Sequence, residues 1–298
     1  MGVDGRSCRR QEKRGLNCVI PACYDETMQE KHSFQDLPTG KPHVSFSEVK
    51  LWKECSYRHS LVHVKKLDVS RPSPVLEFGT AVHSACEDYL LTKEMKPEIC
   101  LHALEDAWRR HIDQEGFNES SLVNAKTEAT SILVEVPTFL DREFKGWEVV
   151  DAEHQLYEPV EGHPHAFKGF IDGVIKTKGK RGEDVYWILD WKTTQRGWFR
   201  EKRSDEMVKA QLALYKNFWH QKNPHVPIKD IRCGFVLLKK SAKTGEHCEL
   251  FSVSLGEVPI KKSLKVVANM ITSVKRGIAL KNRDSCTWCE FKGTDHCT

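Results

Sequence analysis

Residues 186–194, YWILDWKTT, place an acidic and a basic residue on either side of a tryptophan after an apolar run. Side chains alternate between the two faces of a strand, so Asp190 and Lys192 point one way and Trp191 points the other. Burying charges is costly unless they pair or bind an ion. The pattern therefore predicts either an ion pair at a strand end or part of a catalytic centre.

A second carboxylate, Asp172, lies between two glycines in GFIDGVI, where the glycines allow close approach of backbone or ligand. If residues 165–192 form an antiparallel hairpin, Asp172 can lie near Asp190. Two carboxylates so close repel unless a cation sits between them, and oxygen ligands favour Mg²⁺ or Mn²⁺. Lys192 would then stabilise phosphate charge or orient a water. The alternative is a pair of exposed hairpin carboxylates.

Two helical stretches could add to such a centre. His83 and Glu87 are i,i+4 neighbours in GTAVHSACE, and a neutral imidazole can ligate Mn²⁺. Gln211 and Tyr215 share a helix face in the same way, and they could hold a DNA phosphate or orient Lys192. The plainer interpretations are a partly buried, hydrogen-bonded histidine and a helix surface with a half-buried tyrosine.

The stretch TTQRGWFREKR, residues 193–203, follows the acidic strand directly. Cations suit phosphates and aromatic rings suit bases, so this mixture favours binding of single-stranded nucleic acid. The alternative is a solvated loop anchored by two aromatic residues. The candidate nucleic-acid-binding residues are Arg196, Trp198, Phe199, Arg200, Lys202 and Arg203.

The C-terminal stretch CTWCEFKGTDHC contains a C-x-x-C pair, Cys286 and Cys289, followed by Cys297. This spacing is typical of a metal or cluster site whose fourth ligand comes from elsewhere. A Cys₄ zinc site would suit the thiolates as well, and His296 could compete as a ligand.

Bulk properties narrow the class of protein. The 298 residues suffice for one large domain or two small ones, and the net charge of +4 does not by itself indicate a nucleic-acid-binding protein. No apolar run is long enough for a membrane span. Eleven cysteines, an odd number, without a secretory signal argue against a disulfide framework. We therefore expect a cytoplasmic or other reducing intracellular location, with no membrane partner and no secretion.

Periodicity predicts a mixed α/β chain with one central sheet. Residues 1–42 are expected to be a flexible tail. The expected helices span 44–61, 78–91, most of 97–145 with breaks near Gly116 and Pro137, 204–221 with Ser204 as cap, and 258–277. The expected strands span 147–157, 165–176, 184–192, 231–240 and 247–255.

Four motifs, in their order along the chain, resemble those of the PD-(D/E)XK nucleases, and within them the RecB-like branch. They are GTAVHSACE, GFIDGVI, ILDWKTT and QLALY. That branch includes the nuclease domains of RecBCD and AddAB and the CRISPR-associated exonucleases with an iron–sulfur cluster. The resemblance runs from Ser45 to Cys297. It implies an α/β (α+β) fold with a restriction-endonuclease-like core, whose central mixed sheet is flanked by helices. The nuclease domain would span 43–298, with a helical part at 44–145, a catalytic core at 146–280 and a cluster-binding tail at 281–298.

The resemblance also implies roles for individual residues. The catalytic set would be His83, Asp172, Asp190, Lys192, Gln211 and Tyr215, with Mg²⁺ or Mn²⁺ held by His83, Asp172, Asp190 and the carbonyl of Trp191. A [4Fe–4S] cluster would be held by Cys286, Cys289, Cys297 and, from SFSEVKLWKECSYRHSL, Cys55. Ser56 stands where proline is frequent in the family, and this departure touches no ligand.

The function that these features predict is a metal-dependent DNA nuclease, foremost a single-strand exonuclease of recombination, repair, replication or spacer processing. Its partners would be single-stranded DNA or DNA ends, together with a helicase or a recombination or CRISPR-adaptation protein. The alternatives are an endonuclease or flap nuclease of the same chemistry, and a non-catalytic nucleic-acid-binding module. Retention of Asp172, Asp190 and Lys192 argues against the last, because a binding module has no need of two carboxylates facing a polyanion.

Overall fold

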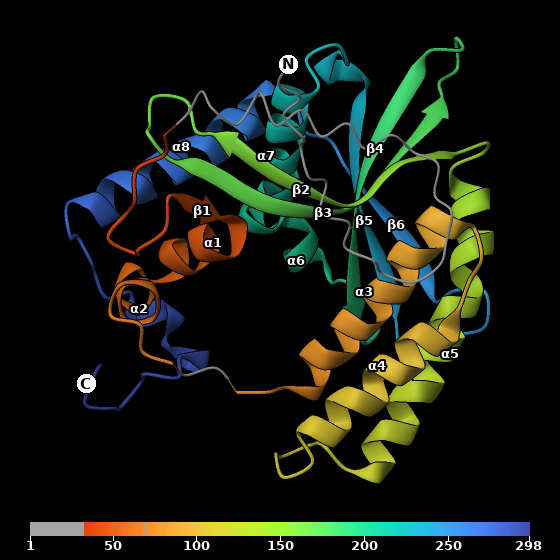
Figure 1. Cartoon of the computed structure of the whole chain (residues 1–298), viewed down its shortest axis with the longest axis horizontal. Helices are drawn as coiled ribbons and strands as arrows, with labels where there is room; N and C mark the ends of the chain where they lie inside the picture. Colours follow the sequence, from red (N-terminus) through yellow and green to blue (C-terminus); the bar gives the residue numbers. More distant parts are fainter. Residues whose placement is uncertain (1–32, 69–70) are drawn as a thin grey trace, which may run out of the picture. The chain divides into compact units, whose positions relative to one another are not determined.

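Six strands form one mixed sheet, in which β1, β3, β4, β5 and β6 follow one another and β2 pairs with β3 (Figure 1). The β2–β3, β3–β4 and β5–β6 pairs are antiparallel, whereas β1–β3 and β4–β5 are parallel. The strands are β1 (His43–Ser45), β2 (Glu148–Pro159), β3 (Ala166–Lys178), β4 (Asp184–Thr194), β5 (Ile231–Lys239) and β6 (Cys248–Val253). The predicted α/β fold with a central mixed sheet is confirmed.

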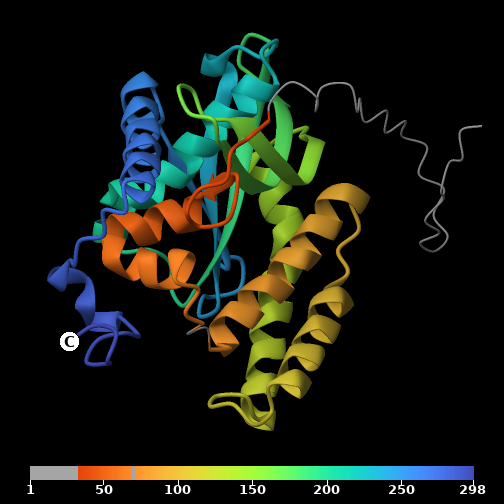
Figure 2. The same cartoon turned by 60° about the vertical axis from the view of Figure 1, so that its left-hand side comes forward.

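Helices cover both faces of this sheet (Figures 1 and 2). One apolar core joins α3, α4 and α5 to sheet residues such as Leu189 and Trp191, and the other joins α1, α7 and α8 to residues such as Ile188 and Phe235. The α-helices are α1 (Phe46–Glu54), α2 (Ser56–His59), α3 (Pro74–Thr92), α4 (Pro97–Arg110), α5 (Glu119–Glu143), α6 (Arg200–Ser204), α7 (Glu206–Lys222) and α8 (Glu257–Lys275). Short turns of other helix types are η2 (Ser60–Val64), η3 (Ile228–Asp230) and η4 (Arg283–Trp288).

The computed structural model describes residues 33–68 and 71–298. Most of the predicted tail, residues 1–32, lies outside the described residues, but its last part packs on the domain. Leu37 and Thr39 are buried, and the Gln35 amide donates to the Pro164 carbonyl at 2.8 Å. Residues 34–298 form one compact unit, so residues 34–42, which were expected to belong to the tail, are part of the domain.

Three predicted helix features were wrong. Asp205, rather than Ser204, caps α7, because its side chain accepts the Met207 amide and Ser204 ends α6. The expected helix over 44–61 breaks at Cys55, which is extended (φ −159°, ψ 106°), and the Cys55 sulfur accepts the Arg58 amide at the start of α2. The expected break at Pro137 is absent, and α5 runs through it. Buried neighbours such as Leu133 and Val136 hold this helix to the core, which compensates for the hydrogen bond that proline removes.

The sheet forks where the chemistry was predicted. β3 and β4 pair from Lys178 and Asp184 as far as Gly173 and Leu189, and there the pairing ends. Beyond that point β3 continues beside β1 and β2, while β4 continues beside β5. Asp172 and Asp190 are the first residues past the last pair, so the fork places them together.

Two glycines of β3 allow helices to approach this fork. A Cβ on Gly173 would lie 2.6 Å from Leu90 Cδ1 of α3, and one on Gly169 would lie 2.8 Å from Tyr215 Cε1 of α7. Both distances are too short for real carbon contacts. The glycines near Asp172 therefore let α3 and α7, which belong to the two different apolar cores, pack closely against the strand.

Candidate active site

Asp172 is anchored in the fork by the backbone of β4. The Trp191 amide donates to Asp172 Oδ2 at 2.7 Å, a bond that becomes available because β3 and β4 no longer pair here. The Trp191 side chain points the other way, into the core formed with α3, α4 and α5. The predicted opposition of Trp191 to its two charged neighbours is thus what the structure shows.

Asp190 is almost fully buried, with a side chain that is 1% exposed. Its Oδ1 accepts a hydrogen bond from Gln211 Nε2 of α7 at 2.7 Å, and its Oδ2 forms an ion pair with Lys192. Gln211 also reaches the Tyr215 hydroxyl at 3.3 Å. A buried carboxylate with an amide on one oxygen and an ammonium on the other is held in a single orientation.

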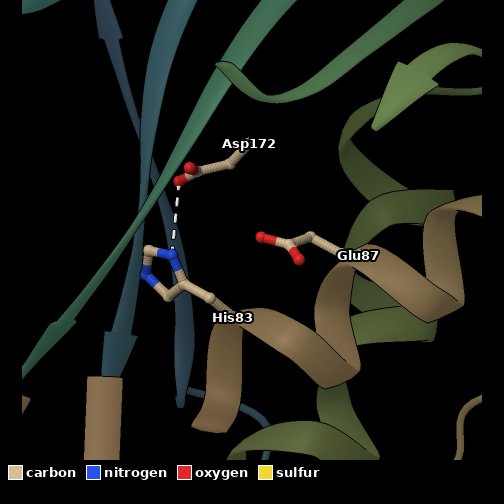
Figure 3. A group of neighbouring side chains, drawn as sticks. All are labelled: His83, Glu87 and Asp172. Carbon is tan, nitrogen blue, oxygen red and sulfur yellow. Dashed lines mark ion pairs between the residues drawn. The ribbon is translucent and has the colours of Figure 1, made fainter. Parts of the chain in front are cut away.

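A group with the geometry of a metal site lies on the α3 side of the fork (Figure 3). One ligand atom each from His83, Glu87 and Asp172 lies within 4.8 Å of the others. His83 Nδ1 is 3.5 Å from Asp172 Oδ2. One imidazole and two carboxylates are a donor set that suits Mn²⁺ or Mg²⁺. His83 and Asp172 belong to the predicted ligand set, and Asp190 lies beside this group, bound instead to Lys192 and Gln211.

Burial and like charges shift the protonation of these three groups. Burial lowers the pKa of His83 to about 4, against the opposing pull of Asp190, so the imidazole is neutral and free to bind a cation. Burial and then the Asp190 charge raise the pKa of Asp172 well above its usual range. Burial, with the Glu153 carboxylate adding to it, raises the pKa of Glu87 to about 7. Carboxyl groups in this state are strong candidates for a cation site.

Lys192, unlike the two carboxyl groups, is held in its charged form. Burial alone would lower its pKa, but the neighbouring carboxylates of Asp190 and Asp172 outweigh that effect and raise it. The ammonium therefore stays charged at neutral pH. Its side chain keeps 32% of its surface exposed, so it lies at the edge of the site. This arrangement suits electrostatic stabilisation of an anion better than abstraction of a proton.

The loop after β4 does not use its aromatic residues as predicted. Trp198 is only 7% exposed and packs against Phe235 and Phe251, with ring centroids 4.9 and 5.9 Å away. It therefore cannot stack on a base while it holds the loop to the sheet. Arg203 donates to the Trp198 carbonyl and pairs with Glu249, so it too supports the loop.

The rest of that loop is open to solvent. Phe199 is 80% exposed, which makes it the free ring of the pair. Arg196, Arg200 and Lys202 are also exposed. Of the two predicted rings, only Phe199 is exposed beside these cations.

The cysteines predicted as one site line one cavity of about 310 Å³, and they are Cys55, Cys286, Cys289 and Cys297. Both ends of the domain meet there. The Asn282 amide donates to the Cys55 sulfur at 3.4 Å, the Tyr57 hydroxyl donates to the His296 carbonyl at 2.9 Å, and Arg58 pairs with Glu290. His296 itself does not line the cavity, and its ring lies edge-on to Phe291.

Comparison with known families agrees with this geometry. The family model of the PD-(D/E)XK nuclease superfamily matches residues 43–294. The chain belongs to this superfamily. As a PD-(D/E)XK nuclease it is a hydrolase of phosphodiester bonds, and the acidic group at the fork is its candidate divalent-metal site. A search of the curated proteins finds no match.

Two solved structures are similar to this PD-(D/E)XK nuclease. One is the "Putative exonuclease" from Eubacterium rectale, which is 14% identical, with 83% of this chain and 86% of that chain covered and a TM-score of 0.49. The other is SSO0001, which is 12% identical, with 71% of this chain and 92% of that chain covered and a TM-score of 0.33. Within the described part of the nuclease, no helix has the length and apolar character needed to cross a membrane.

Glu87 is the site residue that sequence reasoning failed to select. Its spacing from His83 put both side chains on one face of α3, and that signal was available. The spacing could not show that this face meets Asp172. That meeting depends on the close approach of α3 to β3, which Gly173 permits.

Proposed function

We propose that the chain is a metal-dependent DNA nuclease of the RecB-like branch, acting on single-stranded DNA from an end. The observation that carries the proposal is the gathering of His83, Glu87 and Asp172 at the sheet fork, directly beside the Asp190–Lys192 pair. The donor set fits a divalent cation, and a cationic lysine stands next to it. This is the combination that hydrolysis of a phosphodiester needs.

Each residue then has a role set by its contacts. His83, Glu87 and Asp172 would hold Mg²⁺ or Mn²⁺, with Asp190 next to them. Such an ion supplies Lewis-acid chemistry by polarising the phosphodiester. Lys192 remains charged beside Asp190 and stabilises negative charge that develops on the phosphate oxygens. Gln211 keeps Asp190 in its orientation, and Tyr215 supports Gln211.

The cysteine cavity would hold a [4Fe–4S] cluster, as the resemblance implies, with a single zinc ion as the alternative. Cys55, Cys286, Cys289 and Cys297 line it, and thiolates suit both groups. Because Cys55 and Cys297 stand near the two ends of the domain, its role would be structural.

The exposed part of residues 196–202 would contact the strand that is cut. We expect Phe199→Ala to weaken binding of single-stranded DNA by about 5- to 150-fold, the range for loss of one stacked base. Fluorescence anisotropy at fixed salt measures this. Trp198→Phe should keep binding near the wild-type level, because Trp198 packs inside the protein. Unchanged affinity in Phe199→Ala would return the loop to a purely structural role.

The proposal is tested by incubating an end-labelled single strand, and a closed circle of the same sequence, with Mg²⁺ or Mn²⁺. We expect the linear strand to shorten progressively from one end, the circle to persist, and EDTA to stop the reaction. Cleavage of the circle would show an endonuclease of the same chemistry. Absence of metal-stimulated cleavage of either substrate would favour a binding module and contradict the proposal.

A further inference from the structure

The face of the sheet that carries Asp172 continues as an exposed ladder of side chains. Alternation along β3 puts Lys168, Phe170 and Asp172 on one face, and the pairing with β2 sets Tyr157 beside Lys168 and Gln155 beside Phe170. Phe170 is 43% exposed and Tyr157 is 36% exposed. The intervening residues of β3, Gly169 and Ile171, are buried on the other face.

This exposure of aromatic surface is unusual because the same strand has an apolar core available. Phe167, on the buried face, stacks on Phe218 of α7 at 4.4 Å between ring centroids. Phe170 has no such ring partner among the described residues, and a cation, Lys168 Nζ, lies 5.6 Å from the centroid of its ring. Lys168 in turn forms no ion pair within the part of the chain that the structure describes.

We infer that Phe170 and Lys168 form a binding platform for the single strand of DNA on its way to the metal site, with Phe170 stacking on a base and Lys168 contacting a phosphate. The inference rests on the proposed function and deepens it. Aromatic rings and cations side by side are how proteins hold single strands without regard to sequence. The platform is continuous with the candidate active site, because Phe170 lies two residues from Asp172 on the same face, about 7 Å along the strand.

Two cations stand at the Lys168 end of this ladder, because the charges of Lys168 and Lys41, after burial, both help to lower the pKa of His43. Carboxylates stand at both sides of the platform, since Asp36 lies near Tyr157 and the exposed Glu153 lies on β2 near Glu87. Phe170 and Lys168 occupy the space between these charges. Lys168 and Lys41 therefore oppose the charge of Asp36 at one end of the platform, while Glu87 and Asp172 belong to the candidate cation site at the other end.

Binding of a fluorescein-labelled oligothymidylate strand to the full chain tests the platform, on an Asp190→Asn background to suppress cleavage. We expect Phe170→Ala to raise Kd by about 5- to 150-fold, and Phe170→Trp to restore binding because it keeps a stacking face. We expect Val150→Ala to bind as the background does, since Val150 is an apolar β2 residue of similar exposure, 44%. A blunt duplex should respond less to Phe170→Ala, because its bases are already stacked.

Lys168→Gln gives an independent readout that does not depend on the ring. Loss of one phosphate contact on a single strand should reduce the slope of log Kd against log salt by about 0.7. An unchanged Kd in Phe170→Ala together with an unchanged salt slope in Lys168→Gln would overturn the platform. If the wild-type chain also failed to cut any strand, the proposed function would fall as well. Wild-type cleavage with unaltered binding by both variants would remove the platform alone.

Discussion

Asp190→Asn should reduce the rate of single-strand cleavage by at least about 100-fold, the upper end of the range for residues that orient a metal site. Asparagine keeps the shape of the side chain and an oxygen for Gln211, but it removes the charge that pairs with Lys192. The ammonium then loses the partner that fixes it, and the centre loses a carboxylate. Initial rates on an end-labelled strand with Mn²⁺ measure the effect.

DNA binding should respond differently from cleavage in the same variant. Removing a negative charge from a site that receives a polyanion should leave binding intact or make it tighter. Asp184→Asn is the matched control, because Asp184 lies on the same strand and pairs with Lys178 at the surface. We expect the control to cut at the wild-type rate. A wild-type rate in Asp190→Asn would remove the central role of the fork.

Cys289→Ser should remove the metal content of the C-terminal segment and lower the unfolding temperature by at least about 5 °C. A domain of this size loses roughly 2–4 °C for each kcal/mol. Thiolate ligation is coupled to folding, and the site joins segments near both ends of the domain, so its loss frees much of the chain in the unfolded state. Protein purified without oxygen should be brown and contain about four irons per chain before the substitution.

Thr287→Ala is the control for this prediction, because Thr287 is exposed between the two cysteines of the C-x-x-C turn and offers no thiolate. It should keep the colour and the iron. Activity in Cys289→Ser should fall only as far as folding does, since the acidic centre takes none of its ligands from this segment. One zinc ion per colourless chain would mean that zinc occupies the cysteine site instead of a cluster, and the link between the two ends of the domain would stand. Full iron content in Cys55→Ser would place the fourth ligand elsewhere, with His296 and, outside the described residues, Cys18 and Cys23 as alternatives.

Local patterns were sufficient to predict the strand pair that carries the candidate active site. An apolar run that ends in Asp190 and Lys192, preceded by a turn and by a strand with Asp172, fixes a hairpin, and the hairpin register then sets the two carboxylates side by side. The same reasoning gave the faces of Trp191 and Gln211. These relations span a few residues or one strand pair, which is the range over which periodicity carries information.

Relations that depend on how distant elements pack were not predictable in this way. Trp198 beside four cations resembles a stacking ring, yet Phe235 and Phe251 of two later strands bury it. Cys55 interrupts a stretch with helical spacing because its sulfur accepts the amides of Arg58 and of Asn282, near the C-terminus. Phe170 shares a face with Asp172 by strand alternation alone, but the sequence could not show that its ring is exposed, because this depends on how helices pack on the sheet.

The most direct measurement of the central claim is the position of Mn²⁺ in crystals of the protein, from anomalous scattering near the manganese edge. The account predicts a peak at the fork of β3 and β4, within coordination distance of His83, Glu87 and Asp172, and its loss in Asp172→Asn. It also predicts that Lys192 stays beside the peak without ligating it. A peak elsewhere, or no peak at the fork in crystals that cut DNA when dissolved with Mn²⁺, would contradict the assignment of this active site.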